Sequence, residues 1–594
     1  MARSTERPRA AREASQSGPG LPQPTGPLPA VAPPADHASL RRRVDAWLAA
    51  DPDPDTRAEL QELMAAGKWN ELAGRFAGRL AFGTAGLRAE VGAGPLRMNR
   101  LVVRQAAAGL LRYVAGRSPR RSVRIVVGHD ARHGSRSFAT ETAAVARAAG
   151  AEAIWYDRPV PTPVLAYAVR QLGADAGVMV TASHNPPSDN GYKVYLDDGA
   201  QIIPPHDERI AAEIATAAMQ QVPVAEPVPP VSPDEVEQAY LTAISGLLVV
   251  PHARDIRVAS TPLCGVGGPL LLKAFRRGGF AAPHVVDKQA APDPDFPGLP
   301  FPNPEEPGVL DAVVALARDI GADLAVANDP DADRLGAAIP DASGWRALSG
   351  NEIGALLADH LLRHSTGDDR LLVASVVSSR LVERMAIAAG ARFESTLTGF
   401  KWVIRPALAH PELRFLFGYE EALGYSVGSV VRDKDGISAA LVLAEAVAEL
   451  KALGTTPAGR LADLARKFGL HGTRQWSIRF TDRLQGASQA AALMERVRSG
   501  PPARLAGRRI VAVHDLAQPT GELPPADVVL WDLDDQSRIV FRPSGTEPKL
   551  KVYLEVVVPV GAGDDAYRGA TAACEARLAE LQAELVLMLG LPTA

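Results

Sequence analysis

The sequence contains very little cysteine and no long hydrophobic run. Its two cysteines, Cys264 and Cys574, are too few and too far apart in sequence to form a disulfide framework. No window approaches the ~18 uninterrupted apolar residues that a membrane-spanning helix requires. We therefore expect a protein of the reducing cytoplasm that has no membrane partner.

A surplus of basic residues is also missing. The chain has 64 Lys and Arg residues against 68 Asp and Glu residues, which gives a net charge of -4. A nucleic-acid-binding protein usually shows a basic surplus. We therefore expect no nucleic-acid partner, and a small anionic ligand held in local basic pockets.

Large apolar residues are nearly missing from residues 1–36, where prolines are interspersed with Ala, Ser and Gly. This composition predicts a disordered N-terminal extension. The whole chain has 594 residues and is 46% hydrophobic. At ~150 residues per domain, this length predicts about four domains.

A candidate nucleophile follows the apolar run from Ala176 to Val180. In the segment from Thr181 to Pro186, Ser183 places one hydroxyl at the end of a predicted strand. A serine before Asn185 and Pro186 is also common in an ordinary turn. The serine alone leaves both interpretations open.

Three aspartates alternate along the segment that follows another apolar run. Asp329, Asp331 and Asp333 point the same way if the chain is extended, so their carboxylates can converge on one divalent cation. Oxygen ligands favour Mg²⁺. A calcium loop of the helix-loop-helix type is excluded, because it needs glycine and glutamate where this chain has Arg334 and Pro340. A solvated acidic loop is the other alternative.

Two further loops carry ligand-binding groups. Arg542, Ser544, Gly545 and Thr546 offer a guanidinium, two hydroxyls and an open backbone, which are the donors that a phosphate dianion requires. Glu420, paired with a second glutamate in a glycine-flanked loop, can accept hydrogen bonds from vicinal sugar hydroxyls. Taken singly, the first loop could be a tight turn, and the second could be a solvated face.

In this order along the chain, the four motifs resemble those of the alpha-D-phosphohexomutase superfamily, which includes phosphoglucomutases and phosphomannomutases. The resemblance covers about residues 75 to 560. It includes Phe82 to Arg88, Asn190 to Lys193 and Thr398 to Lys401. It implies an α/β fold with three related α/β domains with mixed sheets and a C-terminal α+β domain around a central cleft. The predicted segments are 1–36 (extension), 37–247, 248–345, 346–467 and 468–594.

The resemblance also implies a role for each motif. Ser183 would be phosphorylated, would help to bind Mg²⁺ with the three aspartates, and would donate its phosphoryl group to a sugar phosphate. The activator would be a sugar bisphosphate such as glucose 1,6-bisphosphate. Lys193 would transfer a proton, which requires a lowered pKa, or would act as an electrostatic clamp. The other residues with implied catalytic roles are Arg88, His184 and Arg334, and those implied to bind substrate are Thr398, Gly399, Lys401, Glu420, Arg542, Ser544, Gly545 and Thr546.

The implied reaction interconverts a hexose 1-phosphate and a hexose 6-phosphate. Many hexomutases have serine two residues after the sugar-binding glutamate, whereas this chain has Ala422. A phosphopentomutase or a sugar-1,6-bisphosphate synthase of the same superfamily is therefore an alternative. A metal-dependent sugar phosphatase and a non-catalytic sensor are others. A monomer or a homodimer is expected.

Overall fold

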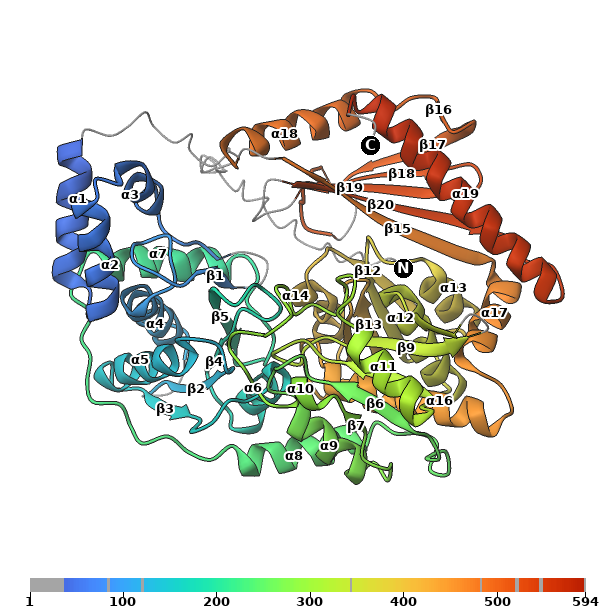
Figure 1. The fold of residues 1–594 in the computed structure, drawn as a ribbon, viewed down its shortest axis with the longest axis horizontal. Coiled ribbons are helices and arrows are strands. Elements are labelled where there is room, and N and C mark those ends of the chain that lie inside the picture. The colour runs from blue at the N-terminus through green and yellow to red at the C-terminus, as the bar shows by residue number, and fades with distance from the viewer. Residues whose placement is uncertain are drawn as a thin grey trace, which may run out of the picture.

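The computed structural model describes residues 37–82, 86–118, 122–341, 344–480, 483–518, 523–543 and 549–591. The extension 1–36, predicted to be disordered, lies outside these residues. Strands of the described residues form four sheets, each built from one continuous part of the chain. Figure 1 shows the four parts in order, from the blue N-terminal helices to the red C-terminal helix.

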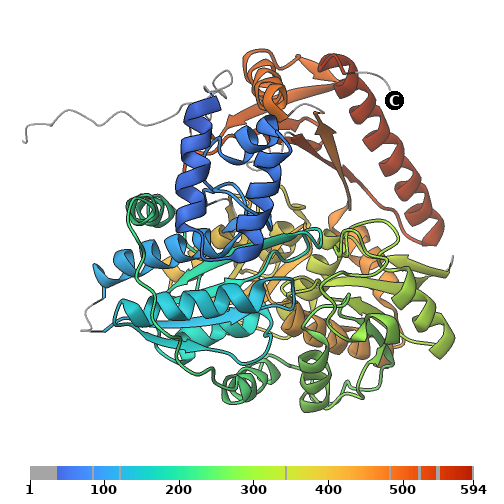
Figure 2. The ribbon, with the colours of Figure 1, turned by 60° about the vertical axis from the view of Figure 1, so that its left-hand side comes forward.

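Three short helices precede the first sheet: α1 (His37–Ala50), α2 (Pro54–Ala65) and α3 (Trp69–Arg75). Leu40, Val44 and Trp47 of α1 are buried against Leu60 of α2 and Leu72 of α3. In Figure 2 these blue helices stand together beside the first sheet. They therefore form a small helical cluster with its own apolar interior.

The first domain has a mixed sheet in the order β1-β5-β4-β2-β3. Its elements are β1 (Leu87–Glu90), α4 (Arg100–Ala115), β2 (Arg124–His129), α5 (Ser135–Ala148), β3 (Glu152–Trp155), α6 (Thr162–Gln171), β4 (Ala176–Val180), β5 (Asp189–Leu196) and α7 (His206–Ala218). Strand β4 pairs parallel with β2 and antiparallel with β5. Ile125 and Val127 share a core cluster with α4 and α5, whereas Val126 belongs to the cluster with α6. Helices therefore cover both faces of the sheet.

The second domain repeats this plan, with the sheet order β10-β9-β8-β6-β7. Its elements are α8 (Asp234–Ser245), β6 (Val258–Thr261), α9 (Gly268–Arg277), β7 (His284–Val285), α10 (Asp287–Ala290), α11 (Asp311–Ile320), β8 (Leu324–Ala327), β9 (Gly336–Asp341) and β10 (Gly344–Ala347). Strand β8 pairs parallel with β6 and antiparallel with β9. The predicted boundary between residues 345 and 346 falls inside β10.

The third domain has the sheet order β12-β11-β13-β14. Its elements are α12 (Gly350–Arg363), β11 (Arg370–Ser375), α13 (Leu381–Ala388), β12 (Arg392–Thr396), α14 (Phe400–Val403), α15 (Arg405–Ala409), β13 (Arg414–Glu420), β14 (Gly424–Val427), α16 (Gly436–Ala452) and α17 (Pro457–Phe468). Ser349 and Glu352 form the capping box that their spacing predicts at the start of α12. Helix α16 is buried on all sides from Gly436 to Leu450, as expected for a helix with few polar positions.

The fourth domain contains an antiparallel sheet in the order β15-β20-β19-β18-β17-β16. Its elements are β15 (Leu470–Arg479), α18 (Arg483–Ser499), β16 (Arg504–Leu505), β17 (Arg508–Asp515), β18 (Val529–Leu533), β19 (Arg538–Pro543), β20 (Lys549–Val558) and α19 (Asp564–Met588). Leu578, Leu581 and Leu585 of α19 are buried on this sheet, as their helical spacing predicts. In Figures 1 and 2, α19 lies on the outer side of the sheet.

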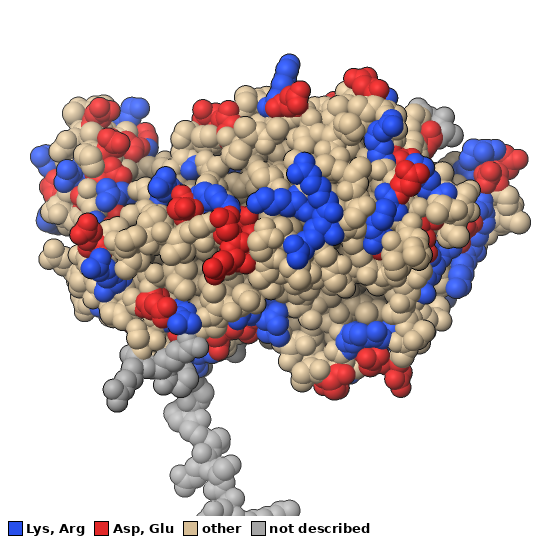
Figure 3. All heavy atoms as spheres, turned by 90° about the horizontal axis from the view of Figure 1, so that it is seen from below, with Lys and Arg blue, Asp and Glu red and all other residues tan. Residues whose placement is uncertain are grey.

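The other face of the fourth sheet packs against the third domain. Val376 and Val377, which follow β11, form one apolar cluster with Val528, Leu530, Val540 and Tyr553. The predicted α/β fold class, with three mixed-sheet domains and a C-terminal α+β domain, is therefore confirmed. Within the described residues, no helix is both long and apolar enough to cross a membrane. Figure 3 shows a face on which basic and acidic side chains are interspersed among other residues.

Candidate active site

The candidate nucleophile lies in a tight loop between β4 and β5. Ser183 has a φ of 53°, in the left-handed region that a non-glycine residue adopts at a cost of roughly 1–2 kcal/mol. Its backbone N–H donates to Thr181 Oγ1 at 2.8 Å, and its side chain is almost fully buried. The loop therefore holds the Ser183 hydroxyl in a fixed, strained position.

Arg132 holds this loop from the neighbouring strand end. Its guanidinium donates to the carbonyl oxygens of Ser183 and Asn185 at 2.6 Å each, of Pro186 at 2.7 Å and of Asp189 at 3.1 Å. A planar guanidinium can make several such bonds at fixed angles. Arg132 is thus a loop-positioning residue, and the sequence analysis gave it no role.

The three predicted metal ligands meet at the serine. Asp329, Asp331 and Asp333 follow β8, all are fully buried, and their ligand oxygens lie within 4.8 Å of one another. The hydroxyl of Ser183 donates to Asp329 Oδ2 at 2.8 Å. The structure therefore brings together all four residues that the sequence predicts as metal ligands.

Two carboxylate oxygens in this group lack partners. Asp331 Oδ1 and Asp333 Oδ1 are buried and have no hydrogen-bond partner among the described residues. A buried, unpaired carboxylate oxygen is costly unless a cation satisfies it. This set of hard oxygen donors fits Mg²⁺.

Protein cations already contact the same carboxylates. Lys193 Nζ lies 2.7 Å from both Asp331 Oδ2 and Asp333 Oδ2. Lys434 Nζ lies 3.3 Å from Asp333 Oδ2. Thr162 Oγ1 donates to Asp331 Oδ2 at 2.6 Å, which joins α6 of the first domain to the acidic loop of the second.

The pKa values of the three carboxyl groups diverge because their neighbours differ. Burial, followed by the charges of Asp331 and Asp333, raises the pKa of Asp329 well above its usual value. Burial also opposes ionisation of Asp331 and Asp333. Lys193 together with Thr162 outweighs this effect at Asp331, and Lys193 together with Lys434 and Arg334 outweighs it at Asp333, so the pKa of each carboxyl is lowered.

Proton transfer by Lys193 would require a lowered pKa, whereas the pKa of Lys193 in this structure is raised. Burial lowers it, but Asp331 and Asp333 outweigh burial and raise it above its usual value. The geometry around Lys193 is therefore that of an electrostatic clamp on two carboxylates. A lowered pKa would require these two charges to be neutralised by another cation.

His184 faces the hydroxyl of Ser183. Its Nδ1 lies 3.1 Å from Ser183 Oγ, and its Nε2 lies 3.5 Å from Arg334 Nη2. Burial, then Arg334 and Arg88, lowers the pKa of His184 well below its usual value, so the ring is neutral. Arg334 can only donate, which leaves the ring proton on Nδ1. His184 therefore donates toward Ser183 and cannot accept its proton in this arrangement.

Arg88 and Arg334 keep donors free in the site. Arg88 Nη1 donates to Asn185 Oδ1 at 3.3 Å, and Arg334 Nη1 donates to Glu305 Oε2 at 3.1 Å. The Nε of each arginine is buried without a hydrogen-bond partner among the described residues. Two unpaired guanidinium N–H donors close to Ser183 can bind an anionic group such as a phosphate.

The predicted sugar-binding loops also meet. The backbone N–H of Gly399 donates to Glu420 Oε1 at 2.6 Å, and Thr398 Oγ1 is buried with no partner among the described residues. This loop borders the acidic loop, because Arg334 forms a β-bridge with Gly424. Lys401 lies apart from this group, with its Nζ 3.8 Å from Asp207 of α7.

The predicted phosphate loop is described only in part. Arg542 lies near the end of β19 and pairs with Lys551 of β20, whereas Ser544, Gly545 and Thr546 lie outside the described residues. Burial lowers the pKa of Lys551 below its usual value, against the opposing charge of Glu421 in the predicted sugar-binding loop.

Comparisons with known proteins identify the family. The first three domains match the phosphoglucomutase/phosphomannomutase alpha/beta/alpha domains I, II and III at residues 79–221, 238–344 and 349–468. A Haemophilus influenzae protein named "Probable phosphomannomutase" is 42% identical over 77% of this chain and 93% of its own length. The chain belongs to the phosphoglucomutase/phosphomannomutase family.

Other proteins similar to this chain are named for a different substrate. The mouse protein named "Phosphopentomutase" is 35% identical over 89% of the chain and 92% of its own length. The crystal structure of a phosphoglucomutase/phosphomannomutase family protein from Burkholderia thailandensis has a TM-score of 0.64 at 20% identity, and covers 86% of this chain and 97% of that one. The chain is therefore a phosphosugar mutase, and the superfamily predicted from its motifs is confirmed.

Two residues that contact the group around Ser183 were not predicted from the sequence: Arg132 and Thr162. Each reaches the serine or an aspartate from a distant segment of the chain. The signal for Arg132 was its place in a charged loop after a predicted strand, where the carboxyl ends of parallel strands gather functional residues. The residues around Thr162 give no comparable signal.

Proposed function

We propose that the chain interconverts a hexose 1-phosphate and a hexose 6-phosphate by moving one phosphoryl group between two hydroxyls of the same sugar. The Ser183 hydroxyl, 2.8 Å from Asp329 in a loop with unpaired carboxylate oxygens and unpaired arginine donors, is the observation that supports this most directly. A covalent relay through Ser183 is needed because the two sugar oxygens cannot be in line with one phosphorus atom.

In the proposed reaction, phospho-Ser183 donates its phosphoryl group to the free hydroxyl of the substrate. The bond from phosphorus to Ser183 Oγ breaks as the bond to the sugar oxygen forms, and the product is a sugar bisphosphate. The bisphosphate then turns around, and its other phosphoryl group returns to Ser183. A small amount of bisphosphate, such as glucose 1,6-bisphosphate, would therefore activate the enzyme.

In the proposed reaction, the residues around Ser183 have different electrostatic roles. Mg²⁺, held by Asp329, Asp331, Asp333 and an oxygen on Ser183, would neutralise charge on the transferring phosphoryl group. Arg88 and Arg334 bind the oxygens of this group through their free Nε–H donors. His184 orients the Ser183 oxygen. Lys193 holds two of the carboxylates in place, and it accepts the proton of the sugar hydroxyl only when those charges are neutralised.

The sugar and the phosphate that does not react bind to other domains. Glu420 accepts hydrogen bonds from two vicinal sugar hydroxyls. It can do so in either orientation of the bisphosphate, because a pair of vicinal hydroxyls offers two similar donors in both orientations. Thr398 and Gly399 shape this loop, and Lys401, which lies apart beside Asp207, would contact the substrate only from the α7 side. The residues proposed to bind the distal phosphate are Arg542, Ser544, Gly545 and Thr546.

A pentose phosphate is the second candidate substrate. The mouse relative that is named a phosphopentomutase aligns with 89% of this chain. Ala422 also removes a hydroxyl that many hexomutases have beside the sugar-binding glutamate. Both candidates use the same serine and the same acidic loop.

Substrate preference separates the candidates. We would measure kcat/KM for the 1-phosphates of glucose, mannose, ribose and deoxyribose, with Mg²⁺ and a trace of the matching bisphosphate. A preference for a hexose phosphate would support the proposal. A preference for a pentose phosphate would show that the substrate is a pentose phosphate instead. Accumulation of free phosphate would indicate a phosphatase, and net formation of bisphosphate would indicate a bisphosphate synthase.

Replacement of Ser183 tests the covalent relay. Ser183→Ala removes the oxygen that carries the phosphoryl group, so turnover should fall by at least about 10⁴-fold, as for the loss of other covalent nucleophiles. The variant should still bind a sugar phosphate in calorimetry. Turnover within tenfold of the parent chain would contradict the phosphoserine mechanism.

Replacement of Asp331 tests the metal assignment. Asp331→Asn removes one buried carboxylate from the group around Ser183, so activity and its dependence on Mg²⁺ should be lost together. Glu306→Gln, at an exposed position of the same domain, is the control. Substantial Mg²⁺-dependent turnover by Asp331→Asn would show that the metal ligands were assigned wrongly.

A further inference from the structure

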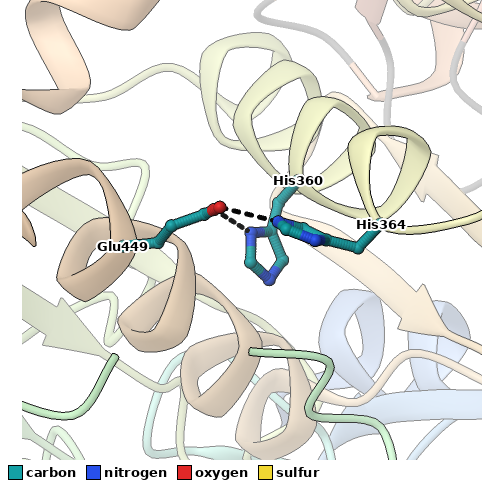
Figure 4. A group of neighbouring side chains, drawn as sticks. All are labelled: His360, His364 and Glu449. Atoms are coloured by element: carbon teal, nitrogen blue, oxygen red, sulfur yellow. Dashed lines mark hydrogen bonds and ion pairs between the residues drawn. The ribbon is translucent and has the colours of Figure 1, made fainter. Parts of the chain in front are cut away.

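A second group of metal-binding side chains lies between helices α12 and α16 of the third domain. Within the described residues, two groups place the ligand atoms of at least three His, Cys, Asp or Glu side chains within 4.8 Å of one another. One is the acidic group at Ser183, and the other consists of His360, His364 and Glu449 (Figure 4). The proposed mutase reaction gives this second group no task.

The two histidines point toward the same carboxylate. His360 lies in the last turns of α12 and His364, four residues later, caps the end of this helix. Figure 4 shows both rings directed at Glu449 of α16. Glu449 Oε2 lies 3.1 Å from His360 Nδ1, and Glu449 Oε1 lies 2.7 Å from His364 Nε2. His360 is fully buried, whereas the His364 side chain is 27% exposed. An ion can therefore reach the group from the side of His364.

The hydrogen bonds of His360 require an additional cation. Its Nδ1 faces Glu449, and its Nε2 faces Glu445 Oε2 at 2.9 Å. An ionised carboxylate can only accept, and a neutral imidazole has one N–H to donate. Two carboxylates at the two ring nitrogens therefore demand either a second proton on His360 or a metal ion at one nitrogen.

Glu445 contacts the ring nitrogen of His360 that faces away from Glu449. It is fully buried and accepts from the backbone N–H groups of Val249 and Val250 at 2.9 Å each. If His360 Nδ1 binds a metal, Nε2–H donates to Glu445, which is the usual arrangement of a carboxylate behind a metal-bound histidine. The backbone contacts leave Glu445 little freedom to move toward the metal itself.

Arg363 orients the carboxylate that would bind the metal. It donates to both oxygens of Glu449, at 2.9 and 2.8 Å. Arg363 thus holds the Glu449 carboxylate in place as an outer hydrogen-bonding partner.

We propose that His360 Nδ1, His364 Nε2 and the carboxylate of Glu449 bind one divalent transition-metal ion, with Zn²⁺ as the best fit. Two imidazoles and one carboxylate are ligands that Zn²⁺ accepts in tetrahedral sites, and a water molecule would complete the set. The ion would replace the second proton of His360, so binding releases a proton. It would join α12 to α16 and stabilise the domain that carries the sugar-binding loop.

Zinc binding by the full-length chain tests this site. The chain is stripped with a chelator and saturated with Mg²⁺, so that the acidic group at Ser183 is occupied, and Zn²⁺ is then titrated against a chromophoric competitor. One equivalent should bind, and it should still bind to Asp331→Asn. His364→Gln should weaken binding by at least about 100-fold, because loss of a ligand should exceed the ~10–100-fold effect of losing an outer partner. Failure of the parent chain to bind Zn²⁺ more tightly than the competitor would overturn the proposal.

A matched variant and a second readout separate metal binding from folding. His410 also contacts two carboxylates, Glu394 and Glu412, but has no second histidine at the same carboxylate, so His410→Gln should leave zinc binding unchanged. Zn²⁺ should raise the melting temperature of the parent chain and of His410→Gln, but not that of His364→Gln. Equal zinc affinity of His364→Gln and the parent chain would also overturn the site, provided circular dichroism shows both to be folded.

Discussion

At the scale of single residues, Arg132 determines where the Ser183 oxygen lies. It makes four hydrogen bonds to carbonyl oxygens of the serine loop, and Ser183 itself has an unfavourable φ of 53°. The strain therefore persists only because the surroundings oppose its relief. Arg132 therefore positions the proposed nucleophile through the backbone of its loop.

Arg132→Lys should lower kcat far more than it changes KM. An ammonium group cannot satisfy four carbonyl oxygens at once, so the loop relaxes and the reacting oxygen shifts, which can cost about 100-fold in rate. Steady-state kinetics with the preferred sugar phosphate would measure the effect. Arg136→Lys, at an exposed position of the same segment, is the control. A kcat within twofold of the parent chain would contradict the positioning role.

Glu421 gives the stability of the chain a pH dependence. Burial, then the charge of Glu420, raises the pKa of Glu421 from 4.5 to about 7. The folded chain therefore binds more protons than the unfolded chain between these values. Its stability falls as the pH rises from about 4.5 to about 7.

Glu421→Gln should flatten that decline, because the amide carries no charge at any pH in this window. Melting temperatures of the parent chain and the variant, measured from pH 4.5 to 8, would show the difference. Glu495→Gln, at an exposed position of α18, should keep the slope of the parent chain. An unchanged slope in Glu421→Gln would mean that another group causes the decline.

At the scale of elements, the first residue of α12 supports the sugar-binding loop. A Cβ atom on Gly350 would lie 1.8 Å from the carbonyl oxygen of Glu421. The Gly350 carbonyl also accepts from Tyr425 at 3.0 Å, which fixes the same loop from its other end. The start of a helix and the turn between β13 and β14 are therefore packed backbone to backbone.

Gly350→Ala should displace this loop and raise KM for the sugar phosphate by about tenfold or more, since a loss of about 1.4 kcal/mol in binding equals tenfold. The overlap is with backbone, so no side-chain rotation relieves it. Gly569→Ala in α19, where a Cβ atom meets nothing within 4 Å, is the matched control and should leave kcat/KM unchanged. Equal KM values for both variants would show that the contact has no effect on binding.

Much of this element structure could be predicted from the sequence. The runs ending at Val180 and Asn328 were predicted to end in functional loops, because strands and the polar segments after them leave a local pattern. The order β1-β5-β4-β2-β3 leaves none, and in this order the parallel pairing of β2 with β4 brings Arg132, after β2, beside Ser183, after β4. The sequence left the role of Lys193 open for a similar reason, because its pKa depends on distances to Asp331 and Asp333, which follow a strand of another sheet.

At the scale of the whole molecule, Glu555 connects the third and fourth domains. It is buried in β20 and accepts from Ser379 Oγ at 2.8 Å and from Arg380 Nε at 2.9 Å, at the start of α13. His471 of β15 lies 2.9 Å from the same carboxylate. The Glu555 carboxylate therefore joins the fourth sheet to the start of α13 in the third domain.

Binding of a sugar bisphosphate should draw the fourth domain toward the other three. A ligand that contacts Glu420 and Arg542 together gains both interactions only when these loops are close, and such closure is common in enzymes that must exclude water. Small-angle scattering should therefore give a smaller radius of gyration with the bisphosphate than without it. The Ser183→Ala chain should close in the same way. An unchanged radius would argue against a large hinge motion.

The separation of Ser183 from its partner carboxylate along the sequence also determines when the two residues can meet during synthesis of the chain. Ser183 and Asp329 are 146 positions apart. A ribosome that adds ~5–20 residues per second needs about 7 to 30 seconds to cover that distance. During this interval the first domain can fold around a serine that has neither its proton acceptor nor the carboxylates around it. The buried acidic group can therefore form around Ser183 only after synthesis has passed Asp333.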